Sequence, residues 1–358
     1  KIKEKFSNIP IVVGGILATT LPYQIMEETR TDIIVKGEGE IASARILNGE
    51  HLASISGVIY KDDCGNIQEN QQRSEQLSKI DEIPWITRFN FRPMEEYVNW
   101  SPRGNHVDKT YSYITSRGCP FTCEFCSIPE KGQRWRSFSP KRVIEEVKFM
   151  IDNYGVTHVE IEDDNFTLKS NHSIPILKYF KKLRNDGYPI KLSFPNGIMI
   201  DRLEREHIFA MKEAGTEMIY LPVESGELKN LIAMNKPAAT EHLEKALQVA
   251  EWCAEAGLDA GSFFIIGYPG GEVLKKNLQE IIREKYADSI LEENAISMWI
   301  KGEDEKSFMG TVEYVKKLVE SGVKYVTPLI ATPYPGTALY EICEKFGWLR
   351  REDHSKMV

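Results

Sequence analysis

Three cysteines within eight residues are the feature of the sequence with the clearest chemical potential. They are Cys119, Cys123 and Cys126, in the stretch SRGCPFTCEFCSIP, with the spacing C-x3-C-x2-C. A structural zinc site requires four closed ligands, and no second pair of Cys or His residues follows nearby, since His106 and His158 stand alone. An electron-carrying iron–sulfur protein uses four cysteines per cluster. Three thiolates therefore indicate a metal centre that keeps one coordination position open.

The same residues resemble the signature of the radical S-adenosylmethionine (SAM) superfamily. Phe125 supplies the aromatic residue before the last cysteine, and the motif follows a strand-like run, KTYSYITSRG. The resemblance implies a [4Fe-4S] cluster whose open iron holds SAM, which one electron cleaves to a 5'-deoxyadenosyl radical, and it implies that Phe125 lies over the cluster and the adenine. It also implies a small-molecule substrate and an electron donor such as flavodoxin or ferredoxin.

The elements around the motif alternate apolar strands with amphipathic helices, as in βα units around a parallel sheet. One predicted helix has Ser139 as its N-cap, Pro140 in its first turn and Gly155 as its stop. Six strands are predicted, which together indicate a partial (βα)6 barrel: residues 111–116, 156–162, 190–195, 217–223, 258–266 and 323–330.

Polar residues follow two of these strands at the ends where β/α barrels carry their chemistry. The run EIEDDNF resembles the stretch of the family that holds the amino group of SAM, although four polar residues there also suit a solvated turn. The run FPNG places Asn196 toward the ribose of SAM, although Asn-Gly is also a turn signal. The matching positions in the first run are Glu162, Asp163, Asp164 and Asn165.

The later strand ends contain a further family-like motif and several glycines. The run PVESG resembles the GIESG run of the family, which implies that Glu224 and Ser225 contact the ribose or the methionine part of SAM. The runs IIGYPG and TPYPGT end the last two strands. Their glycines, Gly267, Gly270 and Gly336, are expected to shape the backbone and not to contact a ligand.

The N-terminal segment reads as a strand ending in Gly14-Gly15, a helix, and a short strand ending in the turn VKGEGE. This is typical of the end of a doubly wound Rossmann-like α/β domain. It resembles the end of the cobalamin-binding domain of one radical SAM class, which implies that Gly14 and Gly15 lie beside cobalamin. Half of such a domain cannot cover both faces of its sheet. We therefore expect an N-terminally truncated cobalamin domain and weak or no cobalamin binding by this chain.

These features suggest a domain order. The end of the cobalamin-binding domain is expected at 1–48, a linker with a β-hairpin at 49–108, the barrel at 109–345 and the start of a C-terminal extension at 346–358. The segment at about 271–302 is expected to be an insertion, because joining its flanks gives a family-like strand end and helix. A surface hairpin is favoured over a lid for this insertion.

The bulk composition argues against several functions. The chain has 358 residues, 42% of them hydrophobic, a net charge of −8 and no block of basic residues, which argues against nucleic acid as a partner. It contains no apolar run near the ~20 residues that span a bilayer and no signal peptide, so a cytoplasmic protein is expected. Disulfides are rare in that compartment, and the scattered Cys64, Cys253 and Cys343 are therefore interpreted as plain thiols.

Three hypotheses follow. The first is a radical SAM enzyme of the cobalamin-binding class, many of whose members transfer a methyl group through methylcobalamin while others form rings. The second is a methylthiotransferase, but those relatives carry a second cysteine triad and an RNA-binding module that this sequence lacks. The third is a non-catalytic or decayed iron–sulfur module, against which the intact motif argues. The sequence favours the first and does not identify the substrate.

Overall fold

The computed structural model of the chain describes residues 2–62, 64–70, 73–85, 94–98, 109–128, 134–268 and 305–345. Two compact units can be distinguished. The first comprises Lys1–Glu82, Phe125–Lys131 and Thr332–Val358, and the second comprises Ile83–Glu124 and Gly132–Ala331. The predicted insertion at 271–302, Gly270 and the predicted C-terminal extension lie outside the described residues.

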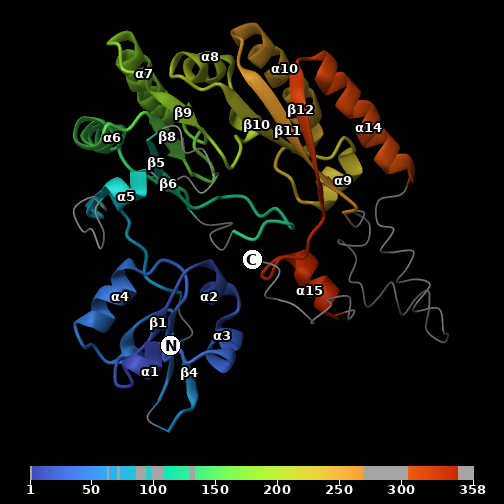
Figure 1. Cartoon of the computed structure of the whole chain (residues 1–358). Coiled ribbons are helices and arrows are strands. Elements are labelled where there is room, and N and C mark those ends of the chain that lie inside the picture. The colour runs from blue at the N-terminus through green and yellow to red at the C-terminus, as the bar shows by residue number, and fades with distance from the viewer. Residues whose placement is uncertain are drawn as a thin grey trace, which may run out of the picture. The chain divides into compact units, whose positions relative to one another are not determined.

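The first unit is built on a four-stranded sheet in the order β1-β2-β3-β4 (Figure 1). The short strands β1 (Val12–Val13) and β2 (Ile33–Val35) pair in parallel, as the Rossmann-like pattern predicts. The hairpin strands β3 (Val58–Lys61) and β4 (Ile67–Glu69) then add in antiparallel pairing, β3 directly on β2. The hairpin expected within 49–108 is therefore an integral part of the same sheet.

Helices cover both faces of this sheet. Along β2 the side chains alternate, so Ile33 and Val35 pack with Ala42 of one helix, while Ile34 packs with Ala18 and Met26 of two others. The hairpin supplies buried residues to both faces, and it thereby closes a core that residues 1–48 were not expected to close alone. The helices of this unit are α1 (Ile2–Lys5), α2 (Ile16–Thr20), α3 (Pro22–Glu28), α4 (Glu40–Leu47) and α15 (Ala338–Lys345).

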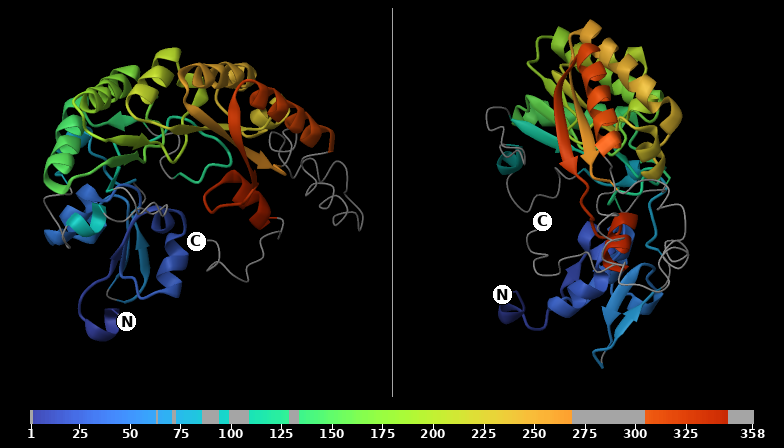
Figure 2. Two further views of the ribbon diagram at one scale, coloured as in Figure 1. Left: turned by 45° about the horizontal axis from the view of Figure 1, so that its top comes forward. Right: turned by 90° about the vertical axis from the view of Figure 1, so that its right-hand side faces the viewer.

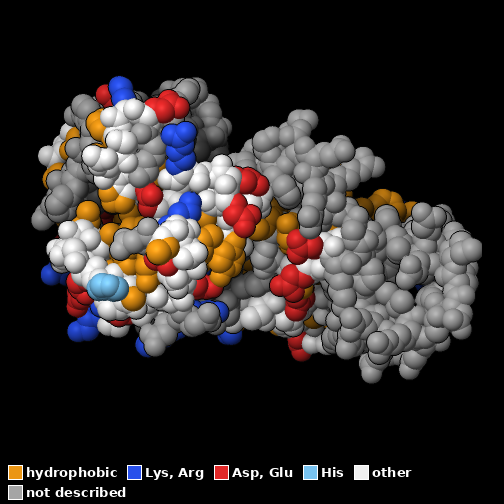
Figure 3. Space-filling view, turned by 90° about the horizontal axis from the view of Figure 1, so that it is seen from below, with side chains coloured by type: hydrophobic (Ala, Val, Ile, Leu, Met, Phe, Trp, Pro, Cys, Tyr) orange, Lys and Arg blue, Asp and Glu red, His pale blue; other side chains and the backbone are white. Residues whose placement is uncertain are grey.

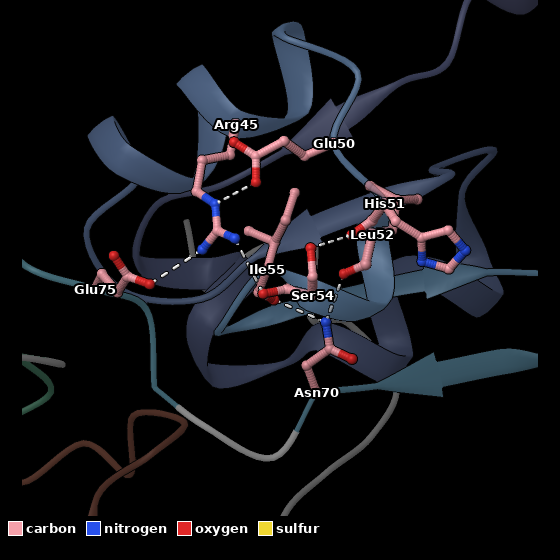
Figure 4. A network of polar contacts seen from close by, with 8 residues as sticks. All are labelled: Arg45, Glu50, His51, Leu52, Ser54, Ile55, Asn70 and Glu75. Carbon is pink, nitrogen blue, oxygen red and sulfur yellow. Dashed lines mark hydrogen bonds and ion pairs between the residues drawn. The ribbon is translucent and has the colours of Figure 1, made fainter.

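A polar network fastens α4 and the segment after it to the irregular segment that follows the hairpin (Figure 4). Arg45 donates to Glu50 at 2.9 Å, to Glu75 at 3.1 Å and to the carbonyl oxygen of Ser54 at 3.3 Å. The Asn70 amide donates to two carbonyl oxygens of the short 3-10 turn η1 (Leu52–Ser54) and the residue after it, at 2.7 Å each. These bonds hold the backbone of the turn to the segment after the hairpin.

The second unit contains two parallel three-stranded sheets. One consists of β5 (Thr110–Tyr113), β8 (His158–Ile161) and β9 (Lys191–Ser193). The other consists of β10 (Met218–Glu224), β11 (Asp259–Ile266) and β12 (Val323–Ile330). All six predicted strands are present within the described residues, and every pairing among them is parallel.

The two sheets meet without a hydrogen-bonded ladder between β9 and β10. Strand β9 is only three residues long, and Pro195, which follows it closely, has no N–H to donate. Single bonds on either side keep the strands adjacent: Leu192 N–H donates to the carbonyl oxygen of Gly215 at 3.4 Å, and Ile198 N–H donates to that of Tyr220 at 2.9 Å. A continuous six-stranded barrel sheet is therefore not formed as such.

Helices lie on the outer side of these strands, which curve around a concave side in Figure 2. The first of the helices, α6 (Pro140–Tyr154), has the ends that its sequence predicts: Ser139 Oγ accepts from Arg142 N–H at 3.3 Å, and Gly155 adopts a left-handed φ of 66°. The others in this unit are α5 (Met94–Val98), α7 (Ser170–Asn185), α8 (Arg205–Glu213), α9 (Leu228–Ala233), α10 (Ala239–Ala256) and α14 (Glu305–Glu320).

On the face in Figure 3, the coloured Lys and Arg side chains lie among acidic and hydrophobic ones. Among the described helices, none has the length and apolar character to traverse a bilayer.

Candidate functional site

The cysteine loop begins at a fixed strand end. Strand β6 (Ser116–Arg117) directly precedes the loop and pairs in antiparallel with β7 (Arg136–Ser137). Gly118 has a φ of +84°, and a Cβ placed there would lie 2.8 Å from the carbonyl oxygen of Arg134. Only glycine tolerates both constraints, so the backbone directly before Cys119 is held in one position.

None of the three cysteines forms a disulfide, and all three are partly exposed. Burial raises the pKa of the Cys119 thiol and the Asp164 carboxylate adds to this, while hydrogen bonds from Phe121 and Asn165 and the charge of Lys236 oppose the shift. Phe125 and Cys126 follow on the same loop and are also half-buried; they are grouped with the first compact unit.

The donor set suits an iron–sulfur cluster better than a single metal ion. Within the part of the chain that the structure describes, no three His, Cys, Asp or Glu side chains converge as ligands of one ion. Thiolates on separate irons of a cluster stand further apart than the ligands of one zinc ion. Three accessible thiols on one short loop, none in a disulfide, therefore fit a cluster with an open iron.

The segment after α9 fastens the middle of the cysteine loop. Glu124 N–H donates to the carbonyl oxygen of Met234 at 2.9 Å, and the Asn235 amide donates to the Thr122 carbonyl oxygen at 3.1 Å and to its hydroxyl at 2.9 Å. Tyr268 is buried at the end of β11, and burial together with Glu124 and Cys123 raises the pKa of its hydroxyl well above its usual range. The loop is thus bordered by the ends of β10 and β11.

Asp163 occupies the centre of a buried network at the start of the loop. Its carboxylate accepts from Thr115 N–H at 2.5 Å, from the Thr115 hydroxyl at 2.6 Å and from the Ser116 hydroxyl at 2.6 Å. The Thr115 hydroxyl also lies 3.0 Å from Nε2 of His172. Burial raises the pKa of Asp163 to about 6, against these hydrogen bonds. Both carboxylate oxygens are therefore used within the protein.

The other polar residues of this strand end have different surroundings. Asp164 is exposed and Glu162 is half-buried, whereas Asn165 is buried and its carbonyl oxygen accepts from Trp135 Nε1 at 3.1 Å. The Asn196 amide donates to the carbonyl oxygen of Glu162 at 2.9 Å, and Asn196 precedes a tight turn at Gly197, whose φ is +82°. The structure therefore brings all of these predicted residues to one edge.

Glu224 is held in an unusual backbone conformation by a buried ion pair. Its φ of 70° lies in the left-handed region, directly after a bulge that begins at Pro222. Its carboxylate lies 3.1 Å from the Lys236 ammonium, with each side chain 8% exposed, and Lys236 also donates to the Pro222 carbonyl oxygen at 2.9 Å. Strained residues of this kind cluster at functional sites.

Ser225 has a side chain that is hydrogen-bonded within the protein. It is fully buried, and its hydroxyl accepts from the Asn230 amide at 3.1 Å and from Glu227 N–H at 3.2 Å. Thr311 of α14 contacts the same hydroxyl at 3.4 Å. These bonds give Ser225 a role in joining β10 to α9 and α14.

The inner faces of the two sheets differ in chemistry. Tyr111 and Tyr113 donate to Glu146 of α6, so the alternate residue Ser112 faces away from the helices and donates to Glu160 at 3.1 Å. On the other sheet, Tyr220 and Phe263 stack with their centroids 4.6 Å apart and an interplanar angle of 9°. One sheet presents hydrogen-bonding groups and the other presents aromatic rings.

The residues expected beside cobalamin form an open surface in the first unit. Gly15 has a φ of +92° and no atom within 4 Å of a Cβ placed there, and a Cβ on Gly14 would meet only Val35. The following residues, Ile16 and Leu17, are 64% and 51% exposed. Uncrowded glycines beside exposed apolar side chains fit a large, flat, largely apolar cofactor.

Sequence reasoning missed several residues of this region: Thr115, His172, Lys236 and Tyr268. Lys236 lies twelve positions after Glu224 in the chain, and α9 brings it back to the strand end. His172 stands alone in the sequence as the third residue of α7. A lone His or Lys in a helix or a helix-to-helix turn carries no periodic or motif signal that marks it as part of a site.

Known proteins resemble this chain in sequence. Residues 113–273, which include the cysteine loop, match the pattern of the Radical SAM superfamily. An uncharacterized methyltransferase of Pyrococcus horikoshii, PH0819, is 30% identical over 341 residues, or 93% of this chain and 63% of that protein. Cytidylyl-2-hydroxyethylphosphonate methyltransferase of Streptomyces wedmorensis is 29% identical, over 72% of this chain and 52% of that protein. The chain thus spans less than two thirds of the length of each of these two relatives.

A solved structure shares the fold. The cobalamin-dependent S-adenosylmethionine radical enzyme OxsB, with aqua-cobalamin and S-adenosylmethionine bound, matches 96% of this chain and 49% of its own chain, with a TM-score of 0.63 and 17% identity. At this identity the similarity extends to the fold alone.

Proposed function

The chain belongs to the radical SAM superfamily, and on that premise we propose that Cys119, Cys123 and Cys126 bind one [4Fe-4S] cluster at which SAM is cleaved reductively. The observation that carries the proposal is the set of three partly exposed thiols, none of them in a disulfide, on the one loop that follows β6. When bound, the cluster would supply the electron for cleavage. The parallel strands of the second unit would then act as the partial (βα)6 barrel.

The chain's own residues would hold and orient SAM. Glu162, Asp164 and Asn196 lie together at the strand ends, and the carboxylate of Glu224 lies at the next strand end. Carboxylates suit the amino group and the ribose hydroxyls of SAM as hydrogen-bond acceptors. Phe125 would cover the cluster from the same loop. Asp163 and Ser225 would support these groups from inside the protein.

Methyl transfer with cobalamin is the reaction that we propose for the whole protein. Two sequence relatives are named as methyltransferases, and the structural neighbour contains aqua-cobalamin. In this chain, Gly14 and Gly15 would lie beside cobalamin in the first unit. A small-molecule substrate and an external reductant are part of the same proposal, and the protein would position them and exclude water.

The proposal is tested by anaerobic reconstitution of the chain with iron and sulfide. About four irons and four sulfides per chain are expected for one [4Fe-4S] cluster, and the reduced protein is expected to convert SAM to 5'-deoxyadenosine. Cys123→Ala removes one ligand and is expected to lower the bound iron severalfold.

The matched control is Cys253→Ala, because Cys253 is buried in α10 and has no role in the proposed site. It is expected to retain the iron content of the wild type. Retention of about four irons by Cys123→Ala would refute the ligand assignment.

A further inference from the structure

The buried network around Asp163 suggests a role that the family resemblance does not assign. Asp163 is 3% exposed, and its two oxygens accept three hydrogen bonds from Thr115 and Ser116. These two residues form the junction between β5 and β6, and Cys119 follows Ser116 by three residues. The carboxylate therefore ties the start of the cysteine loop to the end of the neighbouring strand β8.

The same junction is held from its other side. Phe138 N–H donates to the carbonyl oxygen of Thr115 at 2.9 Å, and His172 reaches the Thr115 hydroxyl from α7. The rings of Trp135 and Phe166 pack against the His172 ring at centroid distances of 5.5 Å and 5.7 Å. Thr115 is thus fully buried, and among its hydrogen-bond partners in the described residues Asp163 supplies the carboxylate.

We infer that Asp163 is a positioning residue that fixes the cysteine loop, and with it the cluster, through Thr115 and Ser116. The inference rests on the proposed function. It differs from a direct contact between Asp163 and the amino group of SAM, because Asp163 is 3% exposed and three of the roughly four acceptor positions of its carboxylate already take hydrogen bonds from inside the protein. A residue that orients a metal ligand through its neighbours affects how firmly the metal is held.

In the test, each reconstituted holoprotein is mixed with a chelator under anaerobic conditions. The rate of iron loss is measured as the decrease in the visible absorbance of the cluster. Asp163→Asn keeps the side-chain shape but offers an amide N–H₂ to groups that are themselves donors. Iron loss from this variant is expected to be roughly tenfold faster than from the wild type. The double variant Thr115→Val with Ser116→Ala removes the two hydroxyl donors and is expected to accelerate iron loss in the same direction.

Glu146→Gln is the matched control. Glu146 is also a buried carboxylate, 2% exposed, and it accepts from Tyr111 and Tyr113 on the helix side of the same strand β5. It lies on the face away from the loop, so its variant is expected to lose iron at the wild-type rate. Far-UV circular dichroism checks that each variant is folded, and the double variant carries the test if Asp163→Asn does not fold.

Several outcomes would overturn the inference. Equal acceleration by Asp163→Asn and Glu146→Gln would indicate general destabilisation. Weaker SAM binding by Asp163→Asn with unchanged iron loss, and no effect of the double variant, would indicate direct contact with SAM. If Asp163→Asn lost iron at the same rate as the wild type, Asp163 would have no role in holding the cluster. A wild-type chain that takes up no cluster would instead refute the proposed function itself, and the inference with it.

Discussion

At the scale of single residues, Asp163 and His172 share one hydroxyl, and burial disfavours the charged form of each. Burial raises the pKa of Asp163 to about 6 and lowers that of His172 to about 4. Near neutral pH the carboxylate is therefore charged and the imidazole is neutral. The Thr115 hydroxyl lies 2.6 Å from the carboxylate and 3.0 Å from Nε2 of His172. It then donates a hydrogen bond to Asp163 and accepts one from the Nε2–H of the neutral imidazole.

These two pKa values predict opposing effects of pH on stability. The pKa of Asp163 is higher in the folded than in the unfolded chain, so its contribution is present below about pH 4 and is lost as the pH rises through 6. The pKa of His172 is lower in the folded chain, so its contribution is present above about pH 6.5 and is lost as the pH falls through 4. The two contributions largely cancel in the wild type.

Single variants separate the two effects. In the His172→Gln variant, Asp163 is the one member of this pair that still titrates. The free energy of unfolding of this variant is therefore expected to fall by about 2–3 kcal/mol between pH 4 and pH 7. With Asp163→Asn it is expected to rise by about the same amount over that range. Urea unfolding at several pH values measures both. Parallel pH profiles for the wild type and both variants would contradict the assignment.

The sequence predicted where the polar residues of the site lie, but not what each of them does. EIEDDNF ends a strand as expected, and its four polar residues do gather at one edge. Their burial depends on neighbours far away in the chain: Asp163 is enclosed by Thr115 of another strand and by α7, while Asp164, the next residue, is exposed. Adjacent identical residues cannot be told apart by local pattern alone.

At the scale of elements, local signals predicted the strands and helix ends well. The caps of α6 follow from Ser139, Pro140 and Gly155 alone, because capping is a local interaction. The interruption between β9 and β10 was not predicted, since pairing depends on the length of β9 and on how Pro195 directs the chain. Such pairing between strands is a non-local property.

The antiparallel pair β6–β7 makes the position of Gly118 sensitive to substitution. Gly118→Ala is expected to destabilise the protein by more than the about 1–2 kcal/mol that a left-handed backbone costs an L-residue, because its Cβ would lie 2.8 Å from the Arg134 carbonyl oxygen. Thermal unfolding measures the loss of stability. Iron loss from the reconstituted variant is also expected to accelerate, because Cys119 follows directly.

Gly65→Ala is the control that measures the cost of the left-handed backbone conformation without a steric contact of the Cβ. Gly65 has a similar φ, +82° against +84° for Gly118, but a Cβ placed there meets nothing within 4 Å. It lies in the turn between β3 and β4. Equal destabilisation by the two substitutions would mean that the contact with Arg134 has no energetic consequence.

At the scale of the whole molecule, the chain divides into two units that each have their own core. The division was only partly predictable. The hairpin β3–β4, which was expected in a linker at 49–108, pairs with β2 and shares its buried residues, and the first unit continues to Glu82. A hairpin signal in the sequence predicts two paired strands but does not indicate which sheet they join.

Two cores predict two unfolding transitions, since cooperativity requires a shared core. Ile34→Ala and Ile161→Ala each remove a buried side chain, 0% and 2% exposed, from β2 and β8 respectively. Each substitution is expected to lower the free energy of unfolding of its own unit by about 2–5 kcal/mol. In scanning calorimetry, each is expected to lower the midpoint temperature of a different transition. A single transition that both substitutions lower equally would show that the units unfold as one.

The ion pair between Glu224 and Lys236 has a consequence for how sequences of this kind can diverge. Replacing either partner alone leaves a buried charge uncompensated, which costs about 3–5 kcal/mol, so a lineage that loses one residue is under pressure to lose the other. The left-handed backbone at position 224 further narrows the replacements to small or amide side chains. Mutational libraries that vary the two positions independently would therefore consist largely of non-viable members, whereas joint changes such as Glu224→Asn with Lys236→Met would survive selection for folding.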